Sequence, residues 1–325
     1  MASAPPPIKI GLALGSGGAR GWAHLGVLQR LTELGIRPHC IAGTSIGSIA
    51  AALYASNSLK TMEDLAIHLD WKRVAQLFFE VNFPRSGLLT GKNFMTMLKS
   101  IIPVRAISSL KIPYAAVATN LENESEVILQ SGNLFEAIRA SIGIPGIFTP
   151  TPFHGQNLVD GGLVNPLPVS VCRKMGADFV IAVDINLRAP LEKRIPPKKS
   201  YRREPPQRIA NLIEAVGKLM PQRYALDASK MSHQWVPAQE NVADSLSIFD
   251  VLTRSFRLVE NEITRRELAI NPPDILIQPK VGDIMTLEFY RGPEAIAAGA
   301  SAVDEVLPAL QALLTPPSSP LTSNA

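Results

Sequence analysis

The segment Gly43-Thr44-Ser45-Ile46-Gly47 constrains the fold of this chain more than any other, because it sets a serine between two glycines at a sharp corner. The apolar residues 40–43 predict a short buried strand, and the alanine-rich residues 46–55 predict a buried helix. Where a strand turns directly into a helix the backbone is crowded, so the residues two before and two after the serine must be small. The segment therefore predicts an α/β fold that exposes the Ser45 hydroxyl at a helix start, where the helix dipole stabilises negative charge.

The rest of the pattern predicts a mostly parallel sheet covered by helices on both faces. Residues 8–14 and 179–185 are near-continuous apolar runs, which suit strands buried on both sides. Strand and helix signals alternate through the first half of the chain, as they do in α/β folds. We expect further strands at 40–43, 112–119, 126–129, 158–160 and 275–278, helices at 20–34, 46–55, 134–140, 241–268 and 293–314, and a helical excursion with loops at 61–102.

Length, composition and the order of the expected elements favour a single domain. The chain has 325 residues, 46% of them apolar, which is enough to bury one large core. We expect this domain to span residues 8–314, between a flexible segment at 1–7 and a disordered Pro/Ser/Thr-rich tail at 315–325. No apolar run reaches the ~18–20 residues of a membrane span, and the N-terminus has no pattern of a secretory signal. A cytoplasmic location is expected, with Cys40 and Cys172 as buried apolar side chains and not as metal ligands.

Positive charge is concentrated in one stretch of the chain. The net charge is +4, yet residues 188–208 contain eight Lys or Arg, two Glu and five Pro, so the remainder is close to neutral. We find no nucleic-acid-binding motif elsewhere and expect no nucleic-acid partner. This stretch belongs to a Pro-rich, basic insertion at about 188–240. It is either a solvated loop or a surface that brings the protein to anionic lipid headgroups.

A glycine-rich turn, Gly15-Ser16-Gly17-Gly18-Ala19-Arg20-Gly21, follows the first expected strand. Such a turn leaves backbone N–H groups unshielded, and two or more of them can stabilise an oxyanion. It is not a dinucleotide fingerprint, because Arg20 stands where the third glycine should be, and no Gly-Lys-Ser/Thr follows it. Arg20 either steadies the turn, attracts an anionic substrate or is a surface charge.

Asp160-Gly161-Gly162 is the best candidate for a general base. The two glycines let the backbone approach another turn closely. In a dry pocket the pKa of the Asp160 carboxyl rises, and proton abstraction by the carboxylate becomes feasible. The rival bases are His154, in a nearby loop, Asp184, at the end of a buried strand, and His233, the only histidine after Asp160.

Together these motifs resemble those of the patatin-like phospholipases, in particular the compact bacterial members. Residues 15–21 are similar to the oxyanion-hole turn of that family, residues 43–47 to its nucleophile motif, and residues 160–162 to its base motif. Residues 140–148 resemble the loop that precedes the base. Order and spacing agree over about 8–186, and less diagnostically over 241–312. Ser16 stands where a run of glycines often continues, which affects the donor geometry alone.

The resemblance implies a three-layer α/β/α sandwich with a mostly parallel central sheet. It also implies a serine acyl hydrolase acting on lipid carboxylic esters, whether phospholipids, lysophospholipids or other fatty acyl esters. Ser45 would be the nucleophile and Asp160 the base, with no histidine, metal or cofactor. The expected oxyanion donors are the backbone N–H groups of Gly17, Gly18, Ala19 and Ile46. The expected supporting residues of the motifs are Gly15, Ser16, Arg20, Gly21, Gly43, Gly47, Gly161 and Gly162.

Two other functions stay open at this point. An acyltransferase would use the same acyl-enzyme, and a non-catalytic lipid-binding regulator would use the basic insertion. The aromatic residues 74–89 belong to the core, line an acyl channel or form a lid. Headgroup, chain length, regiochemistry and oligomeric state leave no mark in the sequence.

Overall fold

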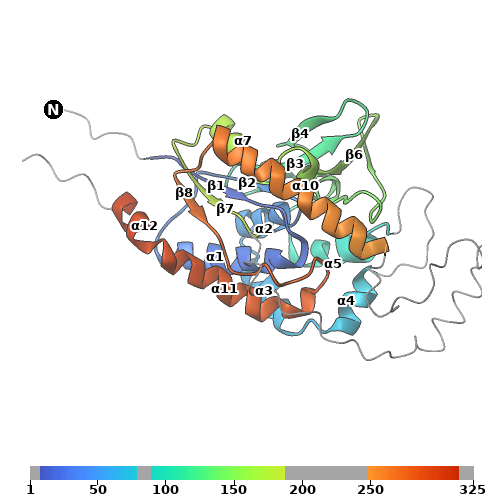
Figure 1. Ribbon diagram of the computed structural model, residues 1–325, viewed down its shortest axis with the longest axis horizontal. Helices are drawn as coiled ribbons and strands as arrows, with labels where there is room; N and C mark the ends of the chain where they lie inside the picture. The colour runs from blue at the N-terminus through green and yellow to red at the C-terminus, as the bar shows by residue number, and fades with distance from the viewer. Residues whose placement is uncertain (1–7, 79–88, 187–247, 315–325) are drawn as a thin grey trace, which may run out of the picture. The chain divides into compact units, whose positions relative to one another are not determined.

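The computed structural model describes residues 8–78, 89–186 and 248–314 (Figure 1). Residues 1–189 and 252–325 form one compact unit, and residues 190–251 form a second, of which only 248–251 are described. The expected flexible N-terminus, the tail, His233 and the whole basic insertion lie outside the described residues. Those expectations therefore stay predictions.

A mixed sheet forms the centre of the first unit. Its order is β5-β6-β3-β2-β1-β7-β8, with β4 paired to β3 on a separate path. The pairs along β3-β2-β1-β7-β8 are parallel, whereas β3–β4, β3–β6 and β5–β6 are antiparallel. The strands are β1 (Ile10–Leu14), β2 (Cys40–Thr44), β3 (Tyr114–Asn120), β4 (Ser125–Leu129), β5 (Thr151–Phe153), β6 (Gln156–Asp160), β7 (Phe179–Val183) and β8 (Ile275–Ile277).

Helices cover both faces of this sheet, which confirms the predicted three-layer α/β/α fold (Figure 1). On one side lie α1 (Trp22–Glu33), α2 (Ile46–Ala55), α3 (Leu59–Ile67) and α11 (Gly292–Glu305), and on the other lie α7 (Val169–Lys174) and α10 (Ile248–Ile270). The other helices are α4 (Trp71–Phe78), α5 (Lys92–Ile101), α6 (Leu134–Ser141) and α12 (Leu307–Leu314), and short 3-10 turns include η1 (Gly18–Gly21), η3 (Gly161–Leu163) and η7 (Phe289–Arg291).

The sheet register brings the motifs together. Leu14 pairs with Gly43 in the parallel β1–β2 ladder, so the glycine-rich turn and the Ser45 corner leave the same edge of the sheet side by side. The antiparallel β3–β6 ladder pairs Ala118 with Asp160, which delivers the base motif to that edge from the opposite chain direction.

Most expected elements are present, and the differences have local causes. The helix expected over 20–34 begins with the turn η1, and the one expected over 293–314 is two helices, α11 and α12. Pro308 explains this division, because it has no N–H to donate to the preceding helical turn. Strand β5 was missed because its three residues lie in a loop dense in proline and glycine, where no alternating pattern can develop.

Candidate active site

Ser45 occupies a strained corner between β2 and α2. Its backbone is at φ 54° and ψ −124°, which a residue with a side chain rarely adopts. A Cβ on Gly43 would overlap the Gly47 carbonyl, and a Cβ on Gly47 would overlap the Leu14 carbonyl. A Cβ on Gly21 would overlap the Ile46 side chain, so the glycine-rich turn also packs tightly on this corner. The small residues that the sequence placed here are therefore required by backbone contact.

The Ser45 hydroxyl donates a hydrogen bond of 2.6 Å to Asp160 Oδ2. Asp160 is fully buried and Ser45 is 5% exposed, so the expectation of an exposed serine was wrong. The carboxylate is held at its other oxygen by the Gly162 N–H, at 2.8 Å. The Ser45 N–H donates to Ser141 Oγ at 2.9 Å. The structure thus brings the two predicted reactive groups into direct contact inside a pocket.

The surroundings of Asp160 favour its protonated form. Burial, followed by the charge of Glu260, raises the pKa of the Asp160 carboxyl to about 8, against the opposing effect of its hydrogen bonds from Ser45 and Gly162. A Cβ on Gly161 would overlap the Val117 carbonyl, which is the close backbone approach that the two glycines predicted. A carboxylate with such a pKa is a far better proton acceptor than one in water.

None of the rival bases contacts Ser45 within the described residues. His154 is exposed in the turn between β5 and β6, with its ring against that of Phe153. Asp184 is buried, and its carboxylate accepts hydrogen bonds from the Asn186 N–H and from Gln278 Nε2. Asp160 is therefore the base that the geometry favours.

The glycine-rich turn offers fewer donors than the sequence suggested. The Ser16 N–H donates to the Pro166 carbonyl, and the Ala19 N–H donates to the Thr286 carbonyl at 2.9 Å. Ala19 is thus engaged by a segment far along the chain and is not available to an oxyanion in this arrangement. Within the described residues, the N–H groups of Gly17 and Gly18 donate to no other backbone carbonyl. The Ile46 N–H, at the first position of α2, has no acceptor within its helix.

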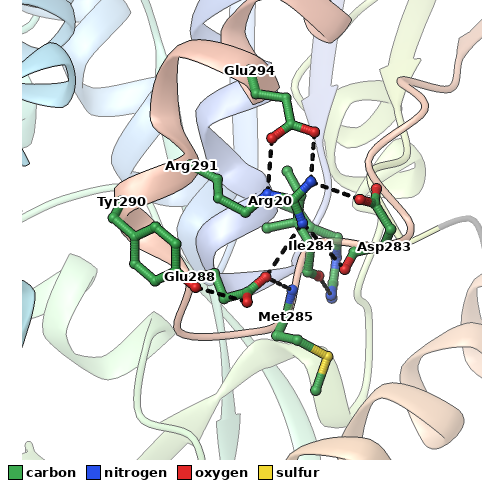
Figure 2. A network of polar contacts seen from close by, with 8 residues as sticks. All are labelled: Arg20, Asp283, Ile284, Met285, Glu288, Tyr290, Arg291 and Glu294. Carbon is green, nitrogen blue, oxygen red and sulfur yellow. Dashed lines mark hydrogen bonds and ion pairs between the residues drawn. The ribbon is translucent and has the colours of Figure 1, made fainter. Parts of the chain in front are cut away.

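Arg20 locks this turn to the C-terminal part of the chain. Its side chain is 1% exposed and donates to the Ile284 carbonyl at 3.0 Å and to Asn186 Oδ1 at 2.6 Å. Figure 2 shows the segment that supplies Ile284, tied down by Arg291, whose guanidinium pairs with Asp283, Glu288 and Glu294. Arg20 is therefore a steadying residue and not a surface charge.

Three functional candidates escaped the sequence analysis: Asn186, Arg257 and Glu260. Glu260 lies on α10 and is 4% exposed. Asn186 Nδ2 donates to Glu260 Oε2 and to Ser16 Oγ, each at 3.3 Å. The sequence did contain one sign of Glu260. Residues Thr253, Phe256, Glu260 and Thr264 follow a helical spacing that places them on one face of α10, so the spacing predicts that the Glu260 carboxylate is buried with that face.

Two pockets meet at the corner. One, of about 310 Å³, is lined by Ser45, the N–H-bearing glycines 17 and 18, and Arg257 and Glu260 of α10. The other, of about 480 Å³, is almost entirely apolar, and its lining includes Ile46, Leu53, Met62, Leu69 and Phe94. Val74 and Leu77 also line it, so this part of the aromatic stretch faces a cavity, whereas residues 79–88 lie outside the described residues.

Two further features of the described residues bear on the chemistry. Cys40 and Cys172 are buried free thiols, as expected, and no group of three or more acidic, His or Cys side chains in that part of the chain could hold a metal ion. No described helix combines the length and apolar character needed to cross a membrane.

Comparison with known proteins shows the family to which the chain belongs. A family model described as patatin-like phospholipase matches residues 12–173. An uncharacterised NTE family protein of Mycobacterium tuberculosis is 31% identical, over 93% of this chain and 92% of its own length. Lysophospholipase NTE1 of Scheffersomyces stipitis is 37% identical over 54% of this chain and 12% of its own. VipD of Legionella pneumophila aligns over 94% of this chain and 67% of its own, at 14% identity and a TM-score of 0.46. The chain belongs to the patatin-like phospholipase family.

Proposed function

We propose that this protein hydrolyses carboxylic esters of lipids through an acyl-enzyme on Ser45, with Asp160 as the general base. The observation that carries the proposal is the 2.6 Å hydrogen bond between the Ser45 hydroxyl and Asp160 Oδ2, made between two buried residues. A serine hydroxyl becomes a useful nucleophile only when a base takes its proton during attack. The raised pKa of Asp160 suits that task near neutral pH.

In the first half of the reaction, Ser45 Oγ attacks the ester carbonyl carbon while its proton passes to Asp160 Oδ2. Negative charge then develops on the former carbonyl oxygen. The backbone N–H groups of Gly17, Gly18 and Ile46 are the proposed donors to that oxygen, and losing one such donor commonly costs ~3–4 kcal/mol of transition-state stabilisation. The bond to the alcohol oxygen breaks, and the alcohol leaves with the proton from Asp160.

In the second half, a water molecule attacks the acyl carbon and gives its proton to Asp160. The bond to Ser45 Oγ breaks, the fatty acid leaves, and the proton returns from Asp160 to the serine. The same residue thus serves twice, as base and then as acid, which removes the need for a histidine.

The apolar pocket suggests where the acyl chain binds. Its lining includes Ile46, the residue next to the nucleophile, and is nearly free of polar surface. Burying an alkyl chain there stabilises the complex by ~0.8 kcal/mol per methylene. We infer that this pocket takes one acyl chain of the substrate, next to Ser45. The name of the NTE1 relative, a lysophospholipase, points the same way.

The test is hydrolysis by the purified full chain of lysophospholipids, diacyl phospholipids and monoacylglycerols with matched acyl chains. We expect release of free fatty acid from monoacyl lipids, abolished in Ser45→Ala. Transfer of the acyl group to an added alcohol in place of water would establish an acyltransferase. Binding to liposomes without turnover of any ester would establish a lipid-binding regulator and refute the proposal.

A further inference from the structure

Glu260 places a second buried carboxyl group beside Asp160. It comes from α10, one hundred residues further along the chain, yet its side chain reaches the base motif. A Cβ built on Gly162 would overlap Glu260 Oε1 and would lie 3.2 Å from Asp160 Oδ1. The two carboxyl groups therefore flank the same backbone position, and glycine is needed there to leave room for Glu260.

The same carboxyl group also holds the glycine-rich turn. The Ser16 hydroxyl hydrogen-bonds to Glu260, and Asn186 Nδ2 donates to Glu260 Oε2 at 3.3 Å. Asn186 in turn accepts the 2.6 Å hydrogen bond from Arg20. Glu260 is thus the point at which the oxyanion turn, the base motif and α10 meet.

We propose that Glu260 is a positioning residue of the reaction: its carboxylate fixes the glycine-rich turn through Ser16 and Asn186 and sets a negative charge against Asp160. This inference rests on the proposed function of Ser45 and Asp160. It assigns Glu260 no bond-making step, since the Ser45 proton goes to Asp160.

Charged groups from several elements face Glu260. Arg20 of η1 attracts its charge, whereas Asp184, after β7, and Asp160, of β6, repel it. Arg257 lies one turn earlier on α10 and lines the same pocket. Burial is the largest effect and raises the pKa of Glu260 to about 7, against the hydrogen bonds from Ser16 and Asn186. The charge of Glu260 therefore bears directly on the protonation of Asp160.

The effect of the Glu260 charge on the pKa of Asp160 has a definite direction. A negative charge beside Asp160 favours the protonated carboxyl and so raises the pKa of the base. When that charge is removed, Asp160 stays ionised, and active, to lower pH. The acidic limb of the pH–rate profile must then shift to lower pH. A role in packing alone would lower the rate and leave the limb in place.

The experiment measures the rate at which a fluorophosphonate labels Ser45 in the full chain between pH 4 and 10. This readout does not require lipid turnover, so a wild type that labels but hydrolyses no ester would refute the proposed function and still test this inference. The variants are Glu260→Gln, which removes the charge, and Glu260→Asp, which keeps it. Glu262→Gln, two residues away with a half-exposed side chain that pairs with Arg265 and Arg266, is the control.

We expect Glu260→Gln to move the acidic limb down by about one pH unit, Glu260→Asp to return it toward the wild-type position, and Glu262→Gln to leave it unchanged. If Glu260→Gln does not fold, Ser16→Ala replaces it: without the Ser16 hydroxyl Glu260 is less often ionised, so the limb moves the same way by less. A limb that stays at the wild-type pH in the folded variant, or that moves equally in Glu260→Asp, would overturn the inference.

Discussion

The Ser45 N–H donates to the Ser141 hydroxyl at 2.9 Å across 96 residues of sequence. Ser141, at the end of α6, donates in turn to the Val117 carbonyl of β3 at 2.6 Å. The strained corner is therefore tied to the central strand through one buried hydroxyl. We expect this contact to help hold the nucleophile in its strained backbone conformation.

Replacing Ser141 by alanine should loosen the nucleophile. The Ser45 N–H and the Val117 carbonyl would lose their partner, at a cost of ~1–3 kcal/mol. We expect kcat/KM for a monoacyl ester to fall by about tenfold to a hundredfold, and the denaturant midpoint to fall. Ser100→Ala, at an exposed position on α5, is the matched control. An unchanged kcat/KM in Ser141→Ala would show that the corner needs no such support.

Asp160 should make the folded chain less stable as the pH rises. Its folded pKa, about 8, lies above the ordinary value of 3.8, so the folded state binds the proton more tightly than the unfolded state. Stability is therefore lost as the pH rises from about 4 to 8. We expect Asp160→Asn to be more stable than the wild type at pH 9, with a smaller gain at pH 5, in urea unfolding. A gain that does not grow with pH would contradict the raised pKa.

The apolar pocket should set the acyl-chain preference. Ala50, on α2, is buried in its wall, and Ala50→Leu would occupy space that an alkyl chain needs. We expect kcat/KM for a sixteen-carbon ester to fall by about tenfold or more, with little change for a four-carbon ester, since each lost methylene contact is worth ~0.8 kcal/mol. Ala297→Leu, at an exposed position of α11, should change neither. Equal losses for both chain lengths would place the acyl group elsewhere.

Arg257 should favour substrates with an anionic headgroup, because it lines the same pocket as Ser45 and the glycine-rich turn. Arg257→Gln is expected to lower kcat/KM for a lysophospholipid by about tenfold, while a monoacylglycerol with the same acyl chain is spared. Arg254→Gln, one turn earlier and exposed, is the control. If kcat/KM falls equally for both substrates, Arg257 supports the fold and does not bind the headgroup.

The parts of the site that depend on local backbone geometry could be predicted from the sequence. The Ser45 corner, the glycine-rich turn and Asp160-Gly161-Gly162 each require small residues at fixed spacing, and such patterns are visible in a single chain. The buried strands β1 and β7 were also visible, because both of their faces are apolar. These features fixed the order of the elements around Ser45.

The parts of the site that the sequence analysis did not predict depend on contacts between segments far apart in the chain. The Ala19 N–H meets the Thr286 carbonyl, and Glu260 meets Asn186 and Ser16, across long stretches of sequence. No local pattern records such pairings, since Thr286 is an ordinary loop residue and Glu260 is one of several charged residues on α10. Burial of Glu260 follows only from the helical stripe that it shares with Phe256.

The most direct test of the account is the rate of Ser45 labelling by a fluorophosphonate in Asp160→Asn, compared with Asp184→Asn. Both variants replace a buried aspartate by its amide isostere, but only Asp160 contacts the nucleophile. We expect Asp160→Asn to fold and to label at least a hundredfold more slowly than the wild type, in line with the loss of a general base, while Asp184→Asn labels within a few fold of it. Labelling of Asp160→Asn at the wild-type rate would contradict the central claim that Asp160 activates Ser45.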